Sequence, residues 1–297
     1  MTYSIVAVDR DGGVMGAAVQ SHYFSTGTVV PWVRPGAGVV ATQAMVNVAY
    51  GPRGLACLEA GLAPDDVLAS LTRADTESAL RQVAIADCQG RASVHTGDLC
   101  IAEAGHARFD GGSCQANMME RDTVWDAMAD AYESSEGEPF ERRLLCALEA
   151  AQHEGGDIRG VQSGAIRTCC IEPSGIPWED SIVDVRVDDS ADPLGDLARL
   201  LSVRDAYALA DRGDDHLGRG EIGHALRAYA EASAKNPENT ELRFWHAVAL
   251  AQAGEEREAR ALMAAVVADD ARWAELLRRL PPSRILDAYL VDRLLRQ

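Results

Sequence analysis

Thr2 is the residue of this chain whose type and place could support chemistry on its own. It follows the initiator methionine, and its small side chain permits removal of Met1. The mature chain would then begin with a threonine that carries both a hydroxyl and a free α-amine. An α-amine has an unperturbed pKa of about 7.7–8.0, so it can accept the hydroxyl proton at neutral pH. The residue type therefore predicts a nucleophile with its own base, although threonine after methionine is also common without any catalytic role.

A hydroxyl that attacks a carbonyl group needs hydrogen-bond donors for the oxyanion that forms. Side-chain amides near strand ends can supply them, and Asn117 is the first candidate, followed by Gln43. Asn117 lies in a segment of small residues before a predicted helix, where it could equally cap the helix or form a turn. Gln43 ends a predicted strand, where the alternative is an amide whose hydrogen bonds are satisfied at the strand end.

Imidazole and small polar side chains near other predicted strand ends are candidates for contact with a substrate. His95 closes a predicted strand before a long loop, and an unperturbed pKa of about 6.5 would let it relay a proton or orient a substrate. The alternative is a structural imidazole bonded to the backbone. The remaining candidates for substrate binding are Ser21, His22, Thr96, Gln162 and Ser163. Within this set, Ser21 and the Gln162–Ser163 pair could also bond the amine of Thr2.

The element that must position Thr2 is a β-hairpin predicted for residues 2–20. Two apolar runs rich in β-branched residues flank the polar, glycine-containing turn 10–13. Both runs are nearly continuous in apolar or small residues, so we expect both faces of the hairpin to be covered. Asp9 and Asp11 belong to the far turn, and a strand of seven residues spans roughly 23 Å, so neither carboxylate can reach the nucleophile.

Pairs of strands and pairs of helices alternate along the following residues. The sequence predicts strands over 29–33, 38–42, 81–87, 91–95, 162–171 and 181–187. It predicts helices over 55–60, from Pro64 onward, over 123–132 and over 140–152. Residues 96–112 contain several glycines and no periodicity, which indicates a long functional loop, and residues 113–119 lead into the next helix. This order fits two sheets sandwiched between helical layers.

Short motifs over the first two thirds of the chain resemble a known family. Together with the opening hairpin they are Val19-Gln20-Ser21, Val29-Val30-Pro31-Trp32, Gly38–Ala44, Arg81-Gln82-Val83, His95-Thr96-Gly97, Gln115–Met118, Gln162–Ala165 and Val183–Asp189. In this order, over residues 1 to about 200, they resemble the DUF1028 family, uncharacterised bacterial proteins similar in fold to the N-terminal-nucleophile (Ntn) hydrolases. The resemblance implies an αββα sandwich with an N-terminal threonine at one end of a sheet, and it implies no substrate.

The composition of the sequence changes at Asp188–Pro193, and no strand-like run occurs beyond this segment. A 34-residue period relates Gly220 to Gly254 and Ala225 to Ala259. This unit resembles a tetratricopeptide (TPR) repeat, in which neighbouring helix pairs bury their apolar faces on one another. We therefore expect an α+β chain of two domains, an Ntn-hydrolase-like domain over 1–195 and an all-α, TPR-like domain over 196–297.

Composition limits the partners and the location that can be expected. The chain has 46 acidic and 28 basic residues and a net charge of −18, which argues against nucleic acid or an anionic membrane as a partner. No apolar run is long enough to span a bilayer, and no secretion signal is evident, so we expect a cytoplasmic protein. The seven cysteines are then expected to be reduced. Cys100, His106 and Cys114, together with His95, are the candidate zinc ligands. Their spacing matches no common zinc site, so we expect no metal and no cofactor.

Two hypotheses for function follow from these features. In the first, Thr2 is the nucleophile of an amide hydrolase that acts on a small polar molecule through an acyl-enzyme. In the second, the first domain is a non-catalytic Ntn-like scaffold and the TPR-like tail docks a protein partner. The tail could also supply a contact between copies, and we expect a homo-oligomer. The sequence contains no serine-hydrolase elbow, zincin, Walker or dinucleotide motif, so it gives those classes no support.

Overall fold

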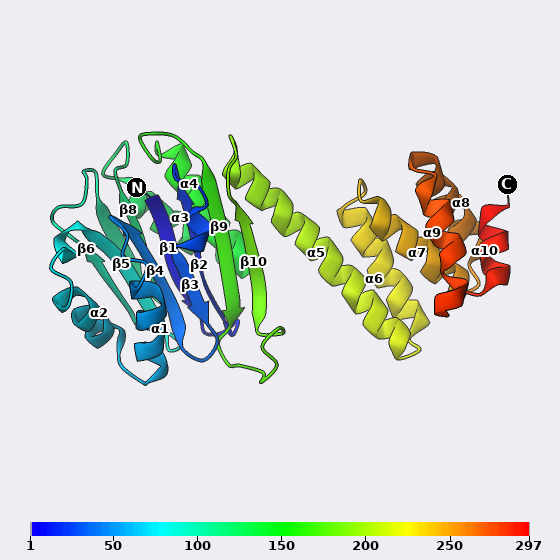
Figure 1. The fold of residues 1–297 in the computed structure, drawn as a ribbon, viewed down its shortest axis with the longest axis horizontal. Coiled ribbons are helices and arrows are strands. Elements are labelled where there is room, and N and C mark those ends of the chain that lie inside the picture. The colour runs from blue at the N-terminus through cyan, green and yellow to red at the C-terminus, as the bar shows by residue number, and fades with distance from the viewer. Residues whose placement is uncertain (1, 297) are drawn as a thin grey trace. The chain divides into compact units, whose positions relative to one another are not determined.

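The computed structural model describes residues 2–296. Contacts along the chain divide it into two compact units, Met1–Arg199 and Leu200–Gln297. The first unit contains both β-sheets, and the second is all-helical (Figure 1).

Two antiparallel sheets stack face to face in the first unit. The six-stranded sheet has the order β10-β9-β2-β1-β8-β7 and the four-stranded sheet the order β3-β4-β5-β6. The strands of the first are β1 (Thr2–Asp9), β2 (Val14–Ser21), β7 (Gly105–Phe109), β8 (Gly112–Asn117), β9 (Ser163–Cys170) and β10 (Ser181–Val187). Those of the second are β3 (Pro31–Arg34), β4 (Gly38–Ala44), β5 (Arg81–Asp87) and β6 (Ala92–Thr96).

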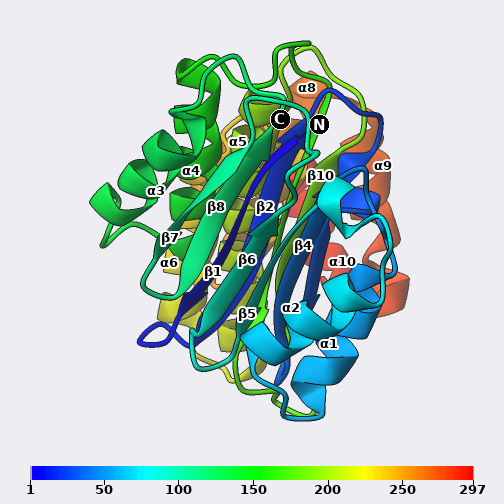
Figure 2. The same cartoon turned by 90° about the vertical axis from the view of Figure 1, so that its left-hand side faces the viewer.

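Helices cover the outer face of each sheet (Figure 2). Helices α1 (Tyr50–Glu59) and α2 (Pro64–Arg73) pack on the four-stranded sheet, and α3 (Val124–Ser134) and α4 (Phe140–His153) pack on the six-stranded sheet. The layers are therefore helix, sheet, sheet and helix. The predicted fold class, an αββα sandwich followed by an all-α region, is confirmed.

The opening hairpin forms as predicted, with β1 antiparallel to β2 over its whole length. In the turn, the Asp9 carboxylate accepts a hydrogen bond from the Gly12 backbone N–H at 2.9 Å. Gly13 has a φ of 68°, a left-handed conformation that glycine adopts without strain. Strand β1 is interior to the sheet, so its first residue lies in the core of the sandwich.

Side chains alternate along β1 between two different cores. Val6 and Val8 face the second sheet and pack in an apolar cluster with Val39 and Ala84 of that sheet. Tyr3 faces the helical layer instead, and its hydroxyl donates to the Gln152 side chain of α4 at 3.0 Å. Burial raises the pKa of Tyr3 far above its ordinary value, so the phenol remains neutral.

One part of the predicted order of elements is wrong. Residues 96–112 are not a single loop, because they contain β7, and residues 112–117 form β8, which pairs with β1. The segment Gly-Ser-Cys-Gln-Ala-Asn lacks β-branched and aromatic residues, so it carries no local strand signal. Its pairing with two neighbouring strands, a non-local interaction, makes it a strand. Helix α1 also begins five residues before its predicted start at Leu55, at Tyr50.

The second unit consists of helices that follow one another along the chain. Helix α5 (Pro193–Gly218) enters it, and α6 (Ile222–Lys235), α7 (Thr240–Gln252), α8 (Glu256–Asp269), α9 (Arg272–Arg279) and α10 (Ala288–Leu295) follow. The 34-residue period has a structural basis, since Gly220 and Gly254 are both left-handed residues just before a helix, with φ of 74° and 85°. Ala225 and Ala259, the next equivalent pair, are both fully buried.

Candidate functional site

Thr2 is the first residue of β1 and is only 4% exposed. By the alternation along the strand, its side chain lies on the face that meets the second sheet. Its hydroxyl donates to the Ser21 hydroxyl at 3.0 Å, because Ser21 ends β2 directly opposite Thr2 in the register of the hairpin. The structure thus places the predicted nucleophile beside a predicted substrate-binding residue, within the sandwich.

The backbone carbonyl of Thr2 accepts hydrogen bonds from one side-chain amide of each sheet. Gln43 Nε2 of β4 lies 3.1 Å from this oxygen, and Asn117 Nδ2 of β8 lies 3.2 Å from it. Asn117 is paired with Thr2 in the register of β1 and β8, which is why its side chain reaches that carbonyl. The two amides predicted as oxyanion donors are therefore brought together at Thr2, but their nitrogens already hold its backbone.

Gln82 of β5 lies behind these two amides. Its Oε1 accepts from Gln43 Nε2 at 2.7 Å and from Asn117 Nδ2 at 2.9 Å. Its Nε2 donates to the Thr96 hydroxyl at 2.9 Å and to the Ala116 carbonyl at 2.8 Å. The predicted residue Thr96 thus belongs to the same group. Gln82 was not predicted, although an amide followed by the apolar run 83–86 is an informative signal for a buried polar role.

A second row of polar groups continues between the sheets. The Ser4 hydroxyl donates to Gln43 Oε1 at 2.6 Å and accepts from Gln115 Nε2 at 2.6 Å. We call Gln43, Gln82, Gln115 and Asn117 the amide cluster. All four side chains are at most 1% exposed. The hydrogen bonds of these side chains to one another, to Ser4 and to the Thr2 carbonyl hold the start of β1 between the two sheets.

The chain turns sharply after both amides that hold Thr2. Ala44, next to Gln43, has a φ of 67°, and Met118, next to Asn117, has a φ of 58°. Such left-handed conformations cost non-glycine residues roughly 1–2 kcal/mol and persist only where the surroundings impose them. Strain of this kind clusters at functional sites, and here it occurs where two strands of different sheets end beside Thr2.

A small cavity adjoins these strand ends. Its volume is about 220 Å³, and it is lined by Ala44, Met45, Leu80, Leu99, Cys100, Ile101 and Asn117. Asn117 thus lines the cavity and also bonds the Thr2 carbonyl. Its Oδ1 is buried and has no hydrogen-bond partner among residues 2–296. Burial raises the pKa of the Cys100 thiol, so this residue contributes a neutral side chain to the wall.

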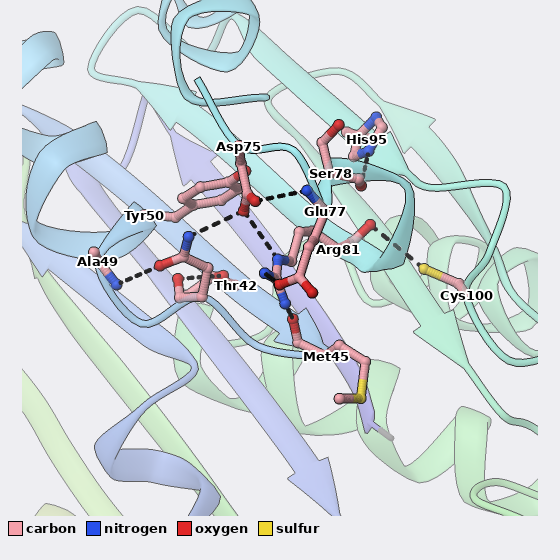
Figure 3. Close-up of polar contacts among 11 residues, drawn as sticks. Thr42, Met45, Ala49, Tyr50, Asp75, Glu77, Ser78, Arg81, His95 and Cys100 are labelled. Carbon is pink, nitrogen blue, oxygen red and sulfur yellow. Dashed lines mark hydrogen bonds and ion pairs between the residues drawn. The ribbon is translucent and has the colours of Figure 1, made fainter. Parts of the chain in front are cut away.

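Arg81 bonds to Met45 and Cys100, which line the cavity (Figure 3). Its guanidinium donates to the Asp75 carboxylate at 3.0 Å and to the Met45 carbonyl at 2.5 Å. Its own carbonyl oxygen lies 3.4 Å from the Cys100 thiol. Hydrogen bonds from Arg81, then from Asn47 and from the Glu77 backbone, hold the pKa of Asp75 well below its usual range. The charged pair therefore stays ionised and anchors the cavity wall at neutral pH.

His95 is not brought to Thr2. It precedes Thr96 by one residue, so its side chain lies on the opposite face of β6, the face that α2 covers. Its Nε2 lies 2.9 Å from the Ser78 carbonyl, a structural hydrogen bond to the backbone (Figure 3). This placement favours the structural alternative that the sequence left open.

The other predicted substrate-binding residues hold the loop that follows β2. His22 Nδ1 lies 3.1 Å from the Val161 carbonyl. The Ser163 hydroxyl donates to the Tyr23 carbonyl at 2.6 Å and accepts from the Thr26 N–H at 3.0 Å. Gln162 is farther out, and its amide donates to Asp189 at 3.1 Å.

An ion pair with a buried carboxylate, which was not predicted, supports the same loop. Asp157, whose side chain is fully buried, lies 2.8 Å from the Arg159 guanidinium and accepts from the His22 backbone N–H at 3.2 Å. Asp157 and Arg159 lie far from His22 in the sequence, so no local pattern predicts the contact. The loop is thereby anchored beside Ser21, the residue to which Thr2 donates.

Comparison with known proteins assigns the first unit. A family model described as a family of unknown function, DUF1028, matches residues 2–197. The chain belongs to the DUF1028 family. The crystal structure of a DUF1028 protein from Silicibacter pomeroyi has 32% sequence identity and a TM-score of 0.61, over 67% of this chain and 84% of that chain. No curated protein matches.

The second unit of this DUF1028 protein also matches a family model. Residues 216–280 match a tetratricopeptide repeat, as the 34-residue period predicts. Within residues 2–296, no helix is long and apolar enough to cross a membrane. The same residues contain no cluster of three or more histidine, cysteine or acidic side chains that could hold a metal ion.

Proposed function

We propose that this DUF1028 protein is an N-terminal-nucleophile amide hydrolase with Thr2 as the nucleophile once Met1 has been removed. The observation that carries the proposal is that neighbouring strands hold Thr2 in place. Its hydroxyl is oriented by Ser21, and its carbonyl is held by an amide from each sheet. Few N-terminal residues are fixed in this way, because chain termini normally fray.

The proposed reaction uses the two groups that the mature Thr2 carries. Its Oγ1 attacks the carbonyl carbon of the amide while its α-amine takes the hydroxyl proton. The tetrahedral intermediate collapses, the C–N bond breaks, and the departing amine receives that proton. Water then attacks the resulting ester while the α-amine takes a proton from it. The ester C–O bond breaks, the proton passes to Oγ1, and the acid leaves with the Thr2 hydroxyl restored. Ser21, 3.0 Å from Oγ1, would orient the hydroxyl in the first step.

Gln43 and Asn117 act in this proposal as positioning residues. Both amide nitrogens already donate to the Thr2 carbonyl and to Gln82 Oε1, so an oxyanion would have to displace one of these bonds. Fixing the peptide that follows the nucleophile sets the direction of its attack. The contribution of the amide cluster is therefore orientation of Thr2 more than direct stabilisation of the oxyanion.

The TPR match favours a second role for residues 200–297. Repeats of this type present extended surfaces for other proteins, and we propose that the tail binds a protein partner. If Thr2 has no chemistry, this role alone would make the protein a scaffold. The homo-oligomer predicted from the sequence also stays a prediction, which sedimentation of the full chain would test.

A labelling experiment that needs no knowledge of the substrate tests the nucleophile. The full chain is first weighed intact to establish whether Met1 is present, and is then treated with a β-lactone, which acylates activated hydroxyls. We expect a chain that begins at Thr2 to gain one acyl group. Thr2→Ser should keep this labelling and Thr2→Ala should abolish it, since serine and alanine also permit removal of Met1.

Thr28→Ala is the matched control, because Thr28 is exposed and lies outside the site. It should be labelled like the wild type. Retention of Met1 throughout the population, or equal labelling of Thr2→Ala and the wild type, would overturn the hydrolase proposal and leave the scaffold.

A further inference from the structure

Strand β10 forms one edge of the six-stranded sheet (Figure 1). The other three edge strands are each in contact with a helix, β7 with α3, β6 with α2 and β3 with α1. In contrast, β10 packs closely on β9 and, among residues 2–296, on no other helix or strand. An unpaired strand edge is a template for a further strand, so this edge is a candidate interaction surface.

The backbone limits the length of strand that β10 can accept. A bulge lies between Ser181 and Val183, and pairing with β9 is regular from there to Val187. In an antiparallel pair, alternate residues point their N–H and C=O groups away from the neighbouring strand. Within residues 2–296, residues 183–187 make backbone hydrogen bonds only to β9. The Asp188 carbonyl already accepts from the Ser25 N–H at 2.9 Å, so the stretch open to a further strand is 183–187.

Valine and charged residues alternate along this stretch. It reads Val183-Asp184-Val185-Arg186-Val187, with one negative and one positive side chain on either side of a central valine. The Asp184 and Arg186 side chains are each 51% exposed. Copies of a chain with a net charge of −18 repel each other overall, whereas this stretch is locally neutral. It is therefore a surface on which two copies can approach.

A second copy of the same strand is the partner that this order of charges fits. Two identical antiparallel strands related by a two-fold axis perpendicular to the sheet have one residue opposite itself. With the axis at Val185, Asp184 lies opposite Arg186 of the second copy, where opposite charges attract. With the axis at Asp184 or at Arg186, two like charges would lie opposite each other. The axis at Val185 also pairs all five residues, so the longest overlap and the best charge match coincide.

We propose that two copies of this chain associate edge to edge through β10, antiparallel and with the two-fold axis at Val185. The two six-stranded sheets then form one continuous sheet across the dimer. Main-chain hydrogen bonds supply the attachment, and the opposite charges fix the register. A five-residue pairing is smaller than a standard interface, so we expect a dissociation constant on the order of 10 µM. The association does not depend on any chemistry at Thr2.

Sedimentation of the full chain in about 0.15 M salt tests the register through an exchange of charges. Asp184→Arg and Arg186→Asp should each weaken the dimer by about tenfold, because each places like charges opposite each other at two symmetric positions. The double variant Asp184→Arg/Arg186→Asp recreates opposite charges at both positions. It should restore the wild-type dissociation constant to within about threefold.

The double variant separates contacts between copies from contacts within one chain. Asp184 lies 3.1 Å from Arg167, and Arg186 lies 3.1 Å from Asp188, both in partly exposed ion pairs. The double variant disrupts both of these pairs, so an effect that came from them would persist in it. Circular dichroism of each variant checks the fold. Asp130→Arg, which makes the same charge change at an exposed position of α3, is the control and should leave the dimer unchanged.

Cysteine cross-linking locates the axis independently of the charges. Val185→Cys should form a reducible dimer under mild oxidation, because the two copies of residue 185 lie about 4.5–5.5 Å apart between their Cα atoms. Val187→Cys is the matched control, since it is also half-buried. Its two copies would lie four residues out of register, roughly 13 Å apart and beyond the reach of a disulfide. The wild type, with seven cysteines, sets the background.

Three results would overturn the proposal. The first is a wild-type chain that stays monomeric at about 200 µM, well above the expected dissociation constant. The second is a folded double variant that dimerises no better than the single variants. The third is equal cross-linking of Val185→Cys and Val187→Cys, which would remain decisive if a charge variant failed to fold.

Discussion

Replacing Gln82 by methionine should destabilise the first unit strongly, although the two side chains have similar length and shape. Gln82 is fully buried, and its Oε1 accepts from both Gln43 and Asn117. Gln82→Met leaves those two N–H groups without an acceptor. At roughly 1–3 kcal/mol for each unpaired buried group, the cost is about 2–6 kcal/mol before any gain from added apolar surface. That is a large fraction of the roughly 5–15 kcal/mol by which domains are stable.

Hydrogen exchange of the β1 and β8 amides measures this loss in the unit concerned, since the chain has two compact units. Gln89→Met, on an exposed turn, is the control and should change stability by no more than about 0.5 kcal/mol. The double variant Gln82→Met/Asn117→Leu should cost less than the sum of the single changes, because it removes partners together. A loss below about 1 kcal/mol for Gln82→Met, or strict additivity in the cycle, would refute the reasoning that the amide cluster is a coupled buried network.

Four further outcomes are expected. Gln20→Met should raise the melting temperature, by the equivalent of about 1–3 kcal/mol, because both polar atoms of the buried Gln20 side chain lack partners within residues 2–296; a lower melting temperature would contradict this. Ala44→Gly should stabilise the first unit by up to about 1 kcal/mol in urea unfolding, since glycine adopts a φ of 67° without strain. The pKa of Asp75 is lowered in the folded state, so the ionised carboxylate stabilises the fold fully above about pH 4, and this contribution is lost as the pH falls further. The stability difference between wild type and Asp75→Asn should therefore be constant from about pH 7 to about 4 and shrink below it. A fragment of residues 1–199 should be soluble and show the circular dichroism of the sandwich; insolubility would mean that the two units are one folding unit.

The last fragment extends four residues beyond the boundary predicted at residue 195. Leu197 is fully buried and packs over Gly164 of β9, where a Cβ atom would lie 2.9 Å from its Cδ1. The composition of the sequence changes near Asp188, but packing on the sandwich continues past that change. The first residues of α5 therefore belong to the first unit.

Elements with a local signal could be predicted from the sequence. The hairpin follows from β-branched runs around a glycine turn, and the helical repeat follows from the equivalent glycines at 220 and 254. Strand β8 has no such signal. Its polar residues Ser113, Gln115 and Asn117 alternate, but Gln115 and Asn117 donate to partners that lie elsewhere in the sequence, Ser4 and Gln82. Until those partners are known, the segment has the composition of a loop.

The sequence did not show which face of its strand each candidate side chain occupies, and this was the main uncertainty at the site. His95 and Thr96 are adjacent, and only one of them can face the layer between the sheets. Histidine has the more versatile chemistry, but the register of β6 with β5 places Thr96 opposite Gln82 and His95 opposite Val83. The cavity was missed for a different reason: Leu80 comes before β5, whereas Leu99 and Ile101 lie between β6 and β7, and the two segments share no pattern in the sequence.

The Thr2 carbonyl links the two sheets, because its two amide donors come from different sheets. A translation of one sheet over the other would move Gln43 relative to Asn117 and break the shared contact with the Thr2 oxygen. The position of Thr2 therefore depends directly on the alignment of the two sheets. Small shear within the sandwich would break the bond from Gln43 to the Thr2 carbonyl before either sheet loses its ladder of hydrogen bonds.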